Sequence, residues 1–384
     1  MRVEPFTPEY LPAVQDFNRR LAAANAPWRF PEDPVPDWLP RGDARPPFQE
    51  FFVVLDGEDV RGAYALKHQE VSFRGQVRAT GNLNLPVSEG MINGRYSLVA
   101  SQLVYDAVRR EPLNFVVGMG GEDARIARVL KAMGWQLTDV PFYFKVLNGY
   151  RFLRQIRFLR KTRLNAFLLD LAALSGAGWV GAKAAHAVLE RPLRRAAPAA
   201  VDIVDGFGSW ADDLWDACAD KYAFASVRTS DVLNRVYPAA PHRFTRLKIS
   251  DERKPIGYAV LREEHGLHDY FGDMRVGMIL DCLALPGDAD QVVRAASRVF
   301  GRRGVDVVLL NHSHPAWCRA LRRAGFLQGP SNFIFAASKQ LAALLASVDG
   351  DGGGRLVMRG DGDWPWGVNF MVTPGARVPE LVRA

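Results

Sequence analysis

Polar side chains that could transfer protons or hold a substrate lie on two consecutive extended segments in the first half of the chain. His68 and Glu70 occupy the first segment, and Asn82 and Asn84 occupy the second. Because side chains alternate along a strand, residues two apart share a face, so each pair projects from one side of its strand. We consider His68 or Glu70 as a general base, if either faces a cleft. Asn82 and Asn84 are candidates for substrate binding, and Tyr96 is a candidate proton donor. The alternatives are solvent-facing positions for the strand residues and core packing for Tyr96.

The stretch Leu83–Trp135 contains the elements that would position these groups. An extended run, Leu83–Val87, leads into a loop with two glycines and then into a segment with helical apolar spacing, Arg95–Arg110. A β-branched run, Asn114–Val117, a second glycine-rich break and a second helix follow. A glycine-rich loop at a helix start can turn its backbone N–H groups toward an anion such as a pyrophosphate. If the loop works in this way, the N–H groups of Ile92–Tyr96 should converge on one point.

This order of elements resembles the GNAT superfamily of acyl-CoA-dependent N-acyltransferases. In that family an Arg/Gln-x-x-Gly-x-Gly/Ala loop after a strand holds the coenzyme A pyrophosphate at a helix N-terminus. A later helix ends in a Gly-Phe-like pair, here Gly134-Trp135. In the loop, Glu89 falls where the family has Arg or Gln, Ile92 replaces its first glycine, and Gly94 matches. The cofactor-binding residues that the resemblance implies are Leu85, Val87, Glu89, Gly90, Ile92, Asn93, Gly94, Arg95, Tyr96 and Ser97.

The resemblance also implies a reaction and its participants. The expected acyl donor is an acyl-CoA, in the first instance acetyl-CoA, the expected acceptor is an amine, and no metal is expected. Such a transfer needs a group that deprotonates the ammonium and hydrogen bonds that polarise the thioester carbonyl. His312, His314 and Cys318 raise the alternative of a metal or thiol site, but they lack a fourth ligand.

An internal repeat divides the chain into two related halves. Three pairs of segments match at one displacement of 191 positions: Val129–Trp135 with Ala320–Phe326, Val116-Val117 with Val307-Val308, and Phe142–Phe144 with Phe333–Phe335. We therefore predict an α/β fold of mixed sheets with two tandem GNAT-like domains. The first domain is expected at 1–147, a helical linker at 148–200, and the second domain, with a Gly/Asp/Trp-rich tail, at 201–384.

The two copies are expected to differ in ligand binding. In the first copy, Leu137–Val146 should close the domain as one aromatic-rich strand. The second copy has no glycine loop, because Leu285-Pro286-Gly287 runs directly into its helix. Asp288, near that helix start, suits the helix dipole and repels a phosphate. We therefore do not expect the second copy to bind coenzyme A.

The segment 148–200 contains a basic amphipathic stretch. Arg151–Arg163 carries six cations and no acid, interleaved with apolar residues. Such segments favour anionic membrane surfaces or nucleic acid, here tRNA rather than DNA. The alternative is a linking helix whose apolar stripe packs between the two domains. Asp170, Lys183 and His186 argue against a transmembrane helix in this region.

Composition and charge set broad limits on the protein. The chain has 384 residues, of which 48% are hydrophobic and 24% charged, as in an ordinary globular protein. Its three widely spaced cysteines favour a reducing compartment, and its first residues lack the apolar core of a signal peptide. We predict a cytoplasmic protein, at most peripheral to the inner face of the membrane. The net charge of +7 suits anionic partners such as coenzyme A, nucleic acid or lipid, but an arginine-rich composition gives the same charge without them.

Three hypotheses for the function follow. The first is a tandem GNAT-like N-acyltransferase that uses acyl-CoA. The second resembles the FemAB-type aminoacyltransferases, which also carry two GNAT-like copies but take the acyl group from aminoacyl-tRNA. The third is a non-catalytic module that has kept the fold for binding or assembly, and the altered glycine loop is its support.

Overall fold

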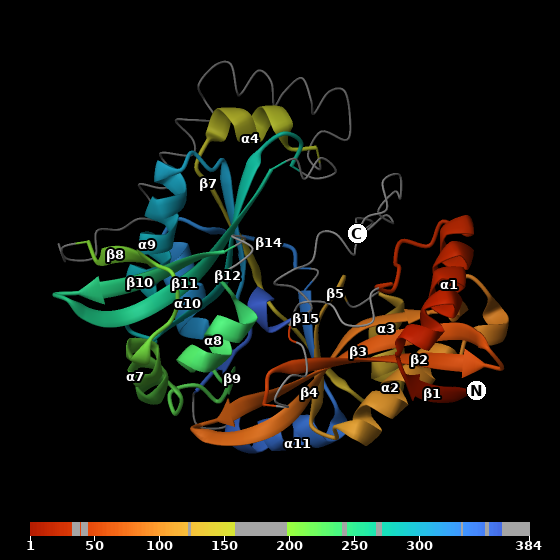
Figure 1. Cartoon of the computed structure of the whole chain (residues 1–384). Coiled ribbons are helices and arrows are strands. Elements are labelled where there is room, and N and C mark those ends of the chain that lie inside the picture. Colours follow the sequence, from red (N-terminus) through yellow and green to blue (C-terminus); the bar gives the residue numbers. More distant parts are fainter. Residues whose placement is uncertain are drawn as a thin grey trace.

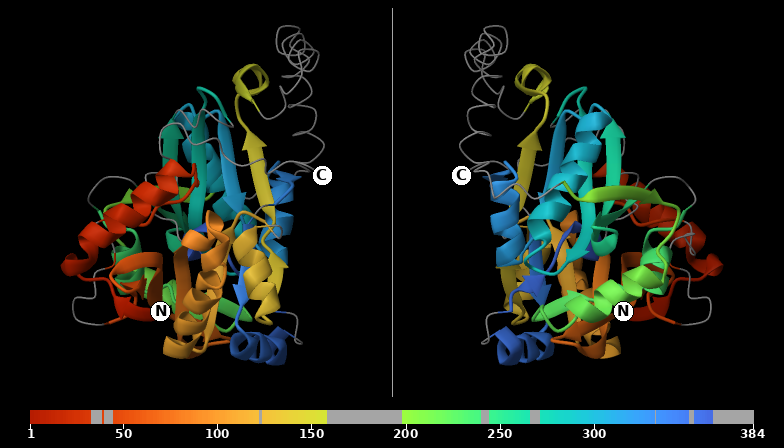
Figure 2. Two further views of the ribbon diagram at one scale, coloured as in Figure 1. Left: turned by 90° about the vertical axis from the view of Figure 1, so that its right-hand side faces the viewer. Right: turned by 90° about the vertical axis from the view of Figure 1, so that its left-hand side faces the viewer.

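Two mixed β-sheets, each covered by helices, form the protein. We describe a computed structural model that covers residues 1–32, 39, 45–121, 124–157, 198–239, 244–265, 271–331, 333–349 and 353–362. Figure 1 shows one sheet with the red and orange first half of the chain, and the other with its green and blue second half. In Figure 1 the two sheets lie side by side, and in the left view of Figure 2 the first sheet stands in front of the second. The predicted tail beyond residue 362 lies outside the described residues.

The first sheet begins as an antiparallel meander. Its strands lie in the order β1-β2-β3-β4-β5-β15-β6, and β9 and β16 join it beside β3. The strand bounds are β1 (Arg2–Pro5), β2 (Phe48–Asp56), β3 (Asp59–Phe73), β4 (Gln76–Ser88), β5 (Asn114–Met119), β6 (Gln136–Asp139), β9 (Phe224–Ser226), β15 (Phe333–Ala337) and β16 (Arg355–Leu356). β5 lies parallel to β4, because the helix between them returns the chain to the same edge.

Helices cover both faces of this sheet because β2 has apolar side chains on both sides. Phe52 and Val54 pack into a core with α2 (Val99–Arg110). Phe51 and Val53, one position out of phase, pack into a second core with α1 (Leu11–Ala23). Alternation along the strand therefore assigns the two helices to opposite faces. α3 (Arg125–Ala132) joins the α2 side through Leu130.

The second sheet is also mixed and covered by helices, and its buried side chains form one large core. Its strands lie in the order β14-β7-β13-β12-β11-β10-β8. The strand bounds are β7 (Phe142–Val146), β8 (Ala200–Val204), β10 (Thr245–Asp251), β11 (Lys254–His265), β12 (Arg275–Ala284), β13 (Val307–Asn311) and β14 (Leu327–Gly329). The helices around this sheet are α4 (Gly149–Gln155), α7 (Ser209–Cys218), α8 (Ser230–Val236), α9 (Ala289–Arg302) and α10 (Pro315–Arg323). The last helix, α11 (Lys339–Val348), packs on the first sheet against β5 and β15.

The internal repeat is reproduced element by element. Phe142–Val146 and Phe333–Ala337, which form β7 and β15, stand 191 positions apart at both ends. The last residues of α3 and α10, Ala132 and Arg323, stand the same distance apart. The predicted mixed α/β fold with two related sheets is therefore confirmed. The domain boundaries at 147 and 201 remain predictions.

The two copies exchange their last strands. β7 of the first half pairs with β13 and β14 of the second sheet, and β15 of the second half pairs with β5 and β6 of the first sheet. Figure 1 shows the yellow β7 among the strands of the second half and the blue β15 among those of the first. The expectation that Leu137–Val146 closes the first domain as one strand is wrong. The chain breaks at Val140-Pro141, where proline cannot donate to a strand ladder, and crosses to the other sheet.

The helix predicted from Arg95 begins at Val99, after short 3₁₀ turns at Glu89–Met91 and Gly94–Tyr96. The linker prediction falls largely outside the described residues, which resume at 198. At its start, Arg151 pairs with the buried Asp306 of the second half, with 3.3 Å between Nη1 and Oδ2. Within the described part of the chain, no helix has the length and apolar character needed to cross a bilayer.

Candidate functional site

The strands β4 and β5 separate soon after they meet. They pair only at Gly81 with Asn114 and at Asn82 with Phe115. Beyond Asn82, the edge of β4 that faces β5 makes no strand pairing in the part of the chain that the structure describes. Diverging strand edges leave backbone N–H and C=O groups available to a ligand.

A bulge in β4 lies just beyond this separation. On the β3 side, Asn84 stands opposite Ala65 but Val87 stands opposite Ala63, so β4 carries one extra residue. Leu85 absorbs it with a φ of 48°, a left-handed conformation that costs a non-glycine residue about 1–2 kcal/mol. Bulges of this kind bend a strand and re-aim its backbone groups.

The loop after β4 uses its own N–H groups internally. The amides of Ile92 and Asn93 donate to the Glu89 carbonyl at 3.0 and 2.9 Å. The amide of Arg95 donates to Asn93 Oδ1, and that of Tyr96 donates to the Asn93 carbonyl. Four of the five amides expected to converge on an anion are therefore bonded within the loop. In this respect the sequence expectation was wrong.

Glu89, at the position where the family has Arg or Gln, forms the centre of a buried ion cluster. Its carboxylate accepts from Arg20 Nη2 at 3.0 Å and from Arg61 Nη1 at 3.1 Å. Desolvation lowers the pKa of Arg61, but the bond and charge of Glu89 outweigh it, so the pKa lies above its usual range. The side chain of Glu89 thus turns inward and its charge is neutralised.

Two further arginines border the loop from its exposed side. Arg125, the first residue of α3, donates from Nη1 to the carbonyls of Met91 at 2.9 Å and Gly90 at 3.3 Å. Arg95 is exposed at the start of the second 3₁₀ turn. Together with Arg20 and Arg61, four guanidinium groups surround this loop. The carboxylates of Glu89 and Asp59 supply only two negative charges to balance them. The loop therefore carries surplus positive charge on side chains instead of convergent amides.

The two loop glycines have different surroundings. A Cβ on Gly90 would lie 2.5 Å from the Tyr96 carbonyl, so this glycine permits the tight fold of the loop. A Cβ on Gly94 would meet nothing within 4 Å, and Gly94 lies outside the left-handed region, so neither space nor backbone conformation requires a glycine there. Asn93 and Ser97 are exposed beside it, whereas Val87 is buried in the α1 core and Ile92 packs against that core.

The catalytic and substrate-binding candidates do not gather in one place. His68 Nε2 lies 2.8 Å from Glu50 Oε2, and its ring stacks on Phe48. Tyr96 is buried, with the Arg61 guanidinium 4.6 Å from its ring centroid, which matches the core-packing alternative. Asn84 is buried in β4. Asn82 donates from Nδ2 to the Asp361 carbonyl at 2.6 Å.

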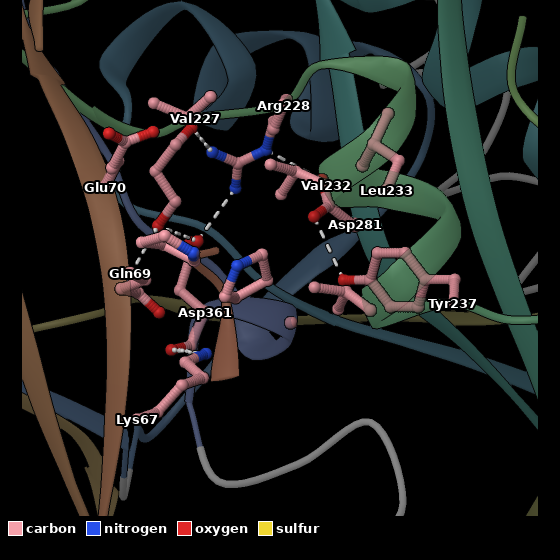
Figure 3. Close-up of a pocket in the computed structure, with 15 residues that line it drawn as sticks. Lys67, Gln69, Glu70, Val227, Arg228, Val232, Leu233, Tyr237, Asp281 and Asp361 are labelled. Atoms are coloured by element: carbon pink, nitrogen blue, oxygen red, sulfur yellow. Dashed lines mark hydrogen bonds and ion pairs between the residues drawn. The ribbon is translucent and has the colours of Figure 1, made fainter. Parts of the chain in front are cut away.

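Glu70 reaches a pocket between the two halves, shown in Figure 3. The pocket is open to solvent, and the space between its lining atoms, with the solvent at its mouth included, is about 450 Å³. It lies at a gap along the edge of β3, because β2 pairs no further than His68 and β9 begins to pair at Val71. Its lining residues are Pro46, Pro47, Lys67, Gln69, Glu70, Ser226, Val227, Arg228, Val232, Leu233, Val236, Tyr237, Asp281, Gly360 and Asp361.

One wall of the pocket is a buried ionic network around Arg228. This side chain, only 1% exposed, donates from Nε to Asp281 Oδ1 at 3.0 Å and from Nη2 to Asp361 Oδ1 at 2.9 Å. Its Nη1 donates to the Ser226 carbonyl. Desolvation lowers the pKa of Arg228, but the two carboxylates outweigh this and raise it well above the usual range. The arginine therefore stays charged.

Asp281 is held by two tyrosines as well as by Arg228. Tyr237 and Tyr258 donate their hydroxyl protons to it at 3.0 and 3.1 Å. Desolvation raises the pKa of Asp281, and the Arg228 guanidinium opposes that rise. Three donors that face one carboxylate favour its ionised form. Figure 3 shows Arg228 between the two aspartates and Tyr237 directed at Asp281.

Sequence reasoning missed this network and the arginines around the β4 loop. Arg228 follows β9, Asp281 lies on β12 and Asp361 lies in a 3₁₀ turn at Arg359–Asp361, so they meet only in the folded chain. No spacing or motif links them. For Arg20 and Arg61, the unexpected acid at Glu89 was the available signal, because a buried carboxylate requires cationic partners.

His312, His314 and Cys318 have structural surroundings. His314 Nδ1 accepts the Ala316 amide at the start of α10, and His312 stacks on Trp317. Desolvation lowers the pKa of His312 well below its usual range and that of His314 to about 4, so both rings are neutral at pH 7. Cys318 is buried and donates to the His312 carbonyl.

In the second half, another segment of the same chain lies in the gap between β12 and β13, the strands that correspond to β4 and β5. β12 and β13 pair in parallel from Val276 to Met278 and then separate, as β4 and β5 do. Residues 353–362, here called the inserted segment, enter there. Met358 Sδ accepts the Cys282 amide of β12, and Met358 forms an antiparallel bridge with His312 after β13.

Comparison with known proteins identifies the fold. No model of a protein family matches the chain, and no curated protein matches it in sequence. A conserved protein of unknown function from Enterococcus faecalis V583, described as a probable N-acyltransferase, has a TM-score of 0.50 and 12% identity, with 89% of this chain and 73% of that chain covered. Saccharomyces cerevisiae N-myristoyltransferase with bound myristoyl-CoA has a TM-score of 0.50 and 11% identity, with 88% and 78% covered.

A GCN5-related N-acetyltransferase from Anabaena variabilis ATCC 29413 has a TM-score of 0.45 and 13% identity over 74% of this chain. This chain spans 62% of the length of that protein. The matches at 0.50 show that the chain has the GNAT fold, as its sequence predicts. At these identities the likeness concerns the fold alone.

Proposed function

We propose that this protein is an N-acyltransferase that moves an acyl group from an acyl-CoA to an amine. The observation that best supports this proposal is that β4 and β5 separate beyond Asn82, beside a loop with surplus positive charge. Acyl-CoA is an elongated molecule with amide groups in its arm and phosphates at one end. Its amides suit diverging strand edges, and its phosphates suit clustered arginines. The yeast N-myristoyltransferase of the same fold was solved with myristoyl-CoA.

In this proposal arginine side chains replace the loop amides as phosphate ligands. Arg95 and Arg125 are exposed beside the loop, and Arg125 already lies against its carbonyls. Guanidinium groups bind phosphate oxygens in a bidentate manner and stay charged at all working pH values. Glu89 does not repel the ligand, because Arg20 and Arg61 neutralise it. Acetyl-CoA is the first donor to test.

The transfer itself needs few protein groups. The neutral amine nitrogen attacks the thioester carbonyl carbon, the C–S bond breaks, and the departing coenzyme A thiolate takes up the proton that the new amide nitrogen loses. Before the attack, the ammonium form of the amine must lose a proton. We assign the role of proton acceptor to Glu70, the candidate general base that lines the pocket. His68 remains a second candidate, although its ring is engaged with Glu50.

The test is calorimetry with acetyl-CoA and with longer acyl-CoAs. Arg125→Glu should weaken acyl-CoA binding at least tenfold, about 1.4 kcal/mol, because it replaces a phosphate ligand by a like charge. Arg128→Glu is the matched control: it makes the same change one turn further along α3, at an exposed position, and should change the affinity less than twofold. An equal loss in both variants would show a general charge effect and would refute the arginine site.

One observation favours the non-catalytic alternative. The amides that hold pyrophosphate in the resembled family are bonded within this loop. A folded protein that releases no heat with any acyl-CoA would support that alternative, and retention of tRNA instead would support the FemAB-like one. The cytoplasmic location and the anionic surface contact through Arg151–Arg163 remain predictions.

A further inference from the structure

The pocket of Figure 3 has two chemically distinct sides. Val232, Leu233 and Val236 of α8, with Val227 and Pro47, provide an apolar side. Val232 is half-buried there, so its side chain is accessible from the pocket. The opposite side is polar and comes from β3 and the Arg228 network. A ligand that fits must therefore carry both an apolar part and a polar group.

The charges of the pocket indicate the sign of that polar group. The lining contains two cations, Lys67 and Arg228, and two aspartates, Asp281 and Asp361, which both pair with Arg228, so these four charges balance. Lys67 Nζ also lies 3.4 Å from the Asp361 carbonyl. Glu70 is the additional carboxylate of the lining, and it is exposed at the rim beside Val227. The pocket as a whole therefore prefers a cation.

The position of the pocket connects it with the diverging strands. Lys67 stands directly opposite Asn82, the last β4 residue that pairs with β5. Both side chains donate to the same carbonyl, that of Asp361. A molecule in the pocket and a thioester between β4 and β5 would thus approach Asp361 from two sides.

We propose that this pocket binds the acceptor, and that the acceptor is a primary amine attached to an apolar group. Its ammonium lies at Glu70, and its apolar part lies against Val232 and Val236. This inference rests on the proposed acyl transfer and adds the class of acceptor to it.

The experiment measures amine binding by calorimetry in the absence of acyl-CoA, with n-hexylamine as the probe. Ethylamine and n-hexanoate are the comparison ligands, because one lacks the apolar part and the other reverses the charge. We expect n-hexylamine to bind at least tenfold more tightly than either. Glu70→Gln should lose at least tenfold in n-hexylamine affinity. Glu58→Gln, the same change at an exposed turn of the β2–β3 hairpin, should lose less than twofold.

A second variant tests the apolar side. Val232→Thr keeps the shape of the side chain but adds a hydroxyl, and it should weaken n-hexylamine about threefold or more without affecting ethylamine. Tighter binding of n-hexanoate, or no binding of n-hexylamine, would overturn the proposal. The acyl-CoA measurement of the preceding subsection decides the proposed function separately: a chain that binds acetyl-CoA but not n-hexylamine keeps the function and loses this acceptor site.

Discussion

The two parallel strand pairs, β4–β5 and β12–β13, separate in the same way, but the gaps that this separation leaves are occupied differently. Each separates after a few paired residues. Between β12 and β13 the inserted segment binds both strands, at Cys282 and at His312. It reaches the first pair only afterwards, at Asn82, and at Val117 beside Gly362. The inserted segment thus contacts both strands of the β12–β13 gap but reaches only the start of the β4–β5 gap, which under our proposal is left for the acyl donor.

The largest expected effect comes from breaking the ion network that anchors the inserted segment. Arg228→Met leaves Asp281 and Asp361 buried without their cation, which should lower the free energy of unfolding by about 3–5 kcal/mol. Urea denaturation measures it. Arg235→Met is the control on α8: Arg235 is partly exposed, pairs with the exposed Asp231 and donates to the Arg45 carbonyl at 2.8 Å, so its loss should cost only about 1 kcal/mol. Equal losses would show that the network does not stabilise the junction.

A pH titration tests the histidine that contacts the inserted segment. A Cβ on Gly354 would lie 2.8 Å from the ring of His314, and the pKa of His314 is lowered to about 4. Between the usual histidine pKa and about 4, the unfolded chain binds a proton that the folded chain does not. Stability therefore falls as the pH falls through this window, by about 3 kcal/mol for this shift.

His314→Asn isolates that contribution. Asparagine keeps a cap acceptor for the Ala316 amide but does not titrate. The free energy of unfolding of the variant should fall by about 3 kcal/mol less than that of the parent between pH 7.5 and pH 4. An unchanged pH dependence would contradict the assignment.

A smaller change tests the close fit of the inserted segment. A Cβ on Gly360 would lie 2.2 Å from the Tyr237 hydroxyl and 2.8 Å from the Leu280 carbonyl of β12. Gly360→Ala should therefore cost about 1–3 kcal/mol through overpacking. At Gly287 an added Cβ meets nothing within 4 Å, so Gly287→Ala is the control and should be near neutral. Thermal unfolding that moves equally in both variants would mean that the segment does not pack tightly between the strands.

The sequence predicted the fold better than the site. The 191-residue register identified the duplicated elements because equivalent strands keep their apolar patterns. The exchange of β7 and β15 was not predictable, since an aromatic-rich strand such as Phe142–Val146 fits either sheet equally well. At the site, Glu70 reached the pocket but His68 turned to Glu50. The network of Arg228 joins segments far apart in sequence, which local patterns cannot reveal.

The exchanged strands also set the order in which the molecule can be assembled during translation. The first sheet keeps an open edge at β5 until Phe333–Ala337 has been synthesised, and β7 waits for β13 in the same way. Pairing between such distant segments is slow, and an open strand edge invites wrong partners meanwhile. We expect neither half to fold when expressed alone, whereas the two halves produced together should complement each other. In this sense the duplication yielded one folding unit, although the sequence contains two copies.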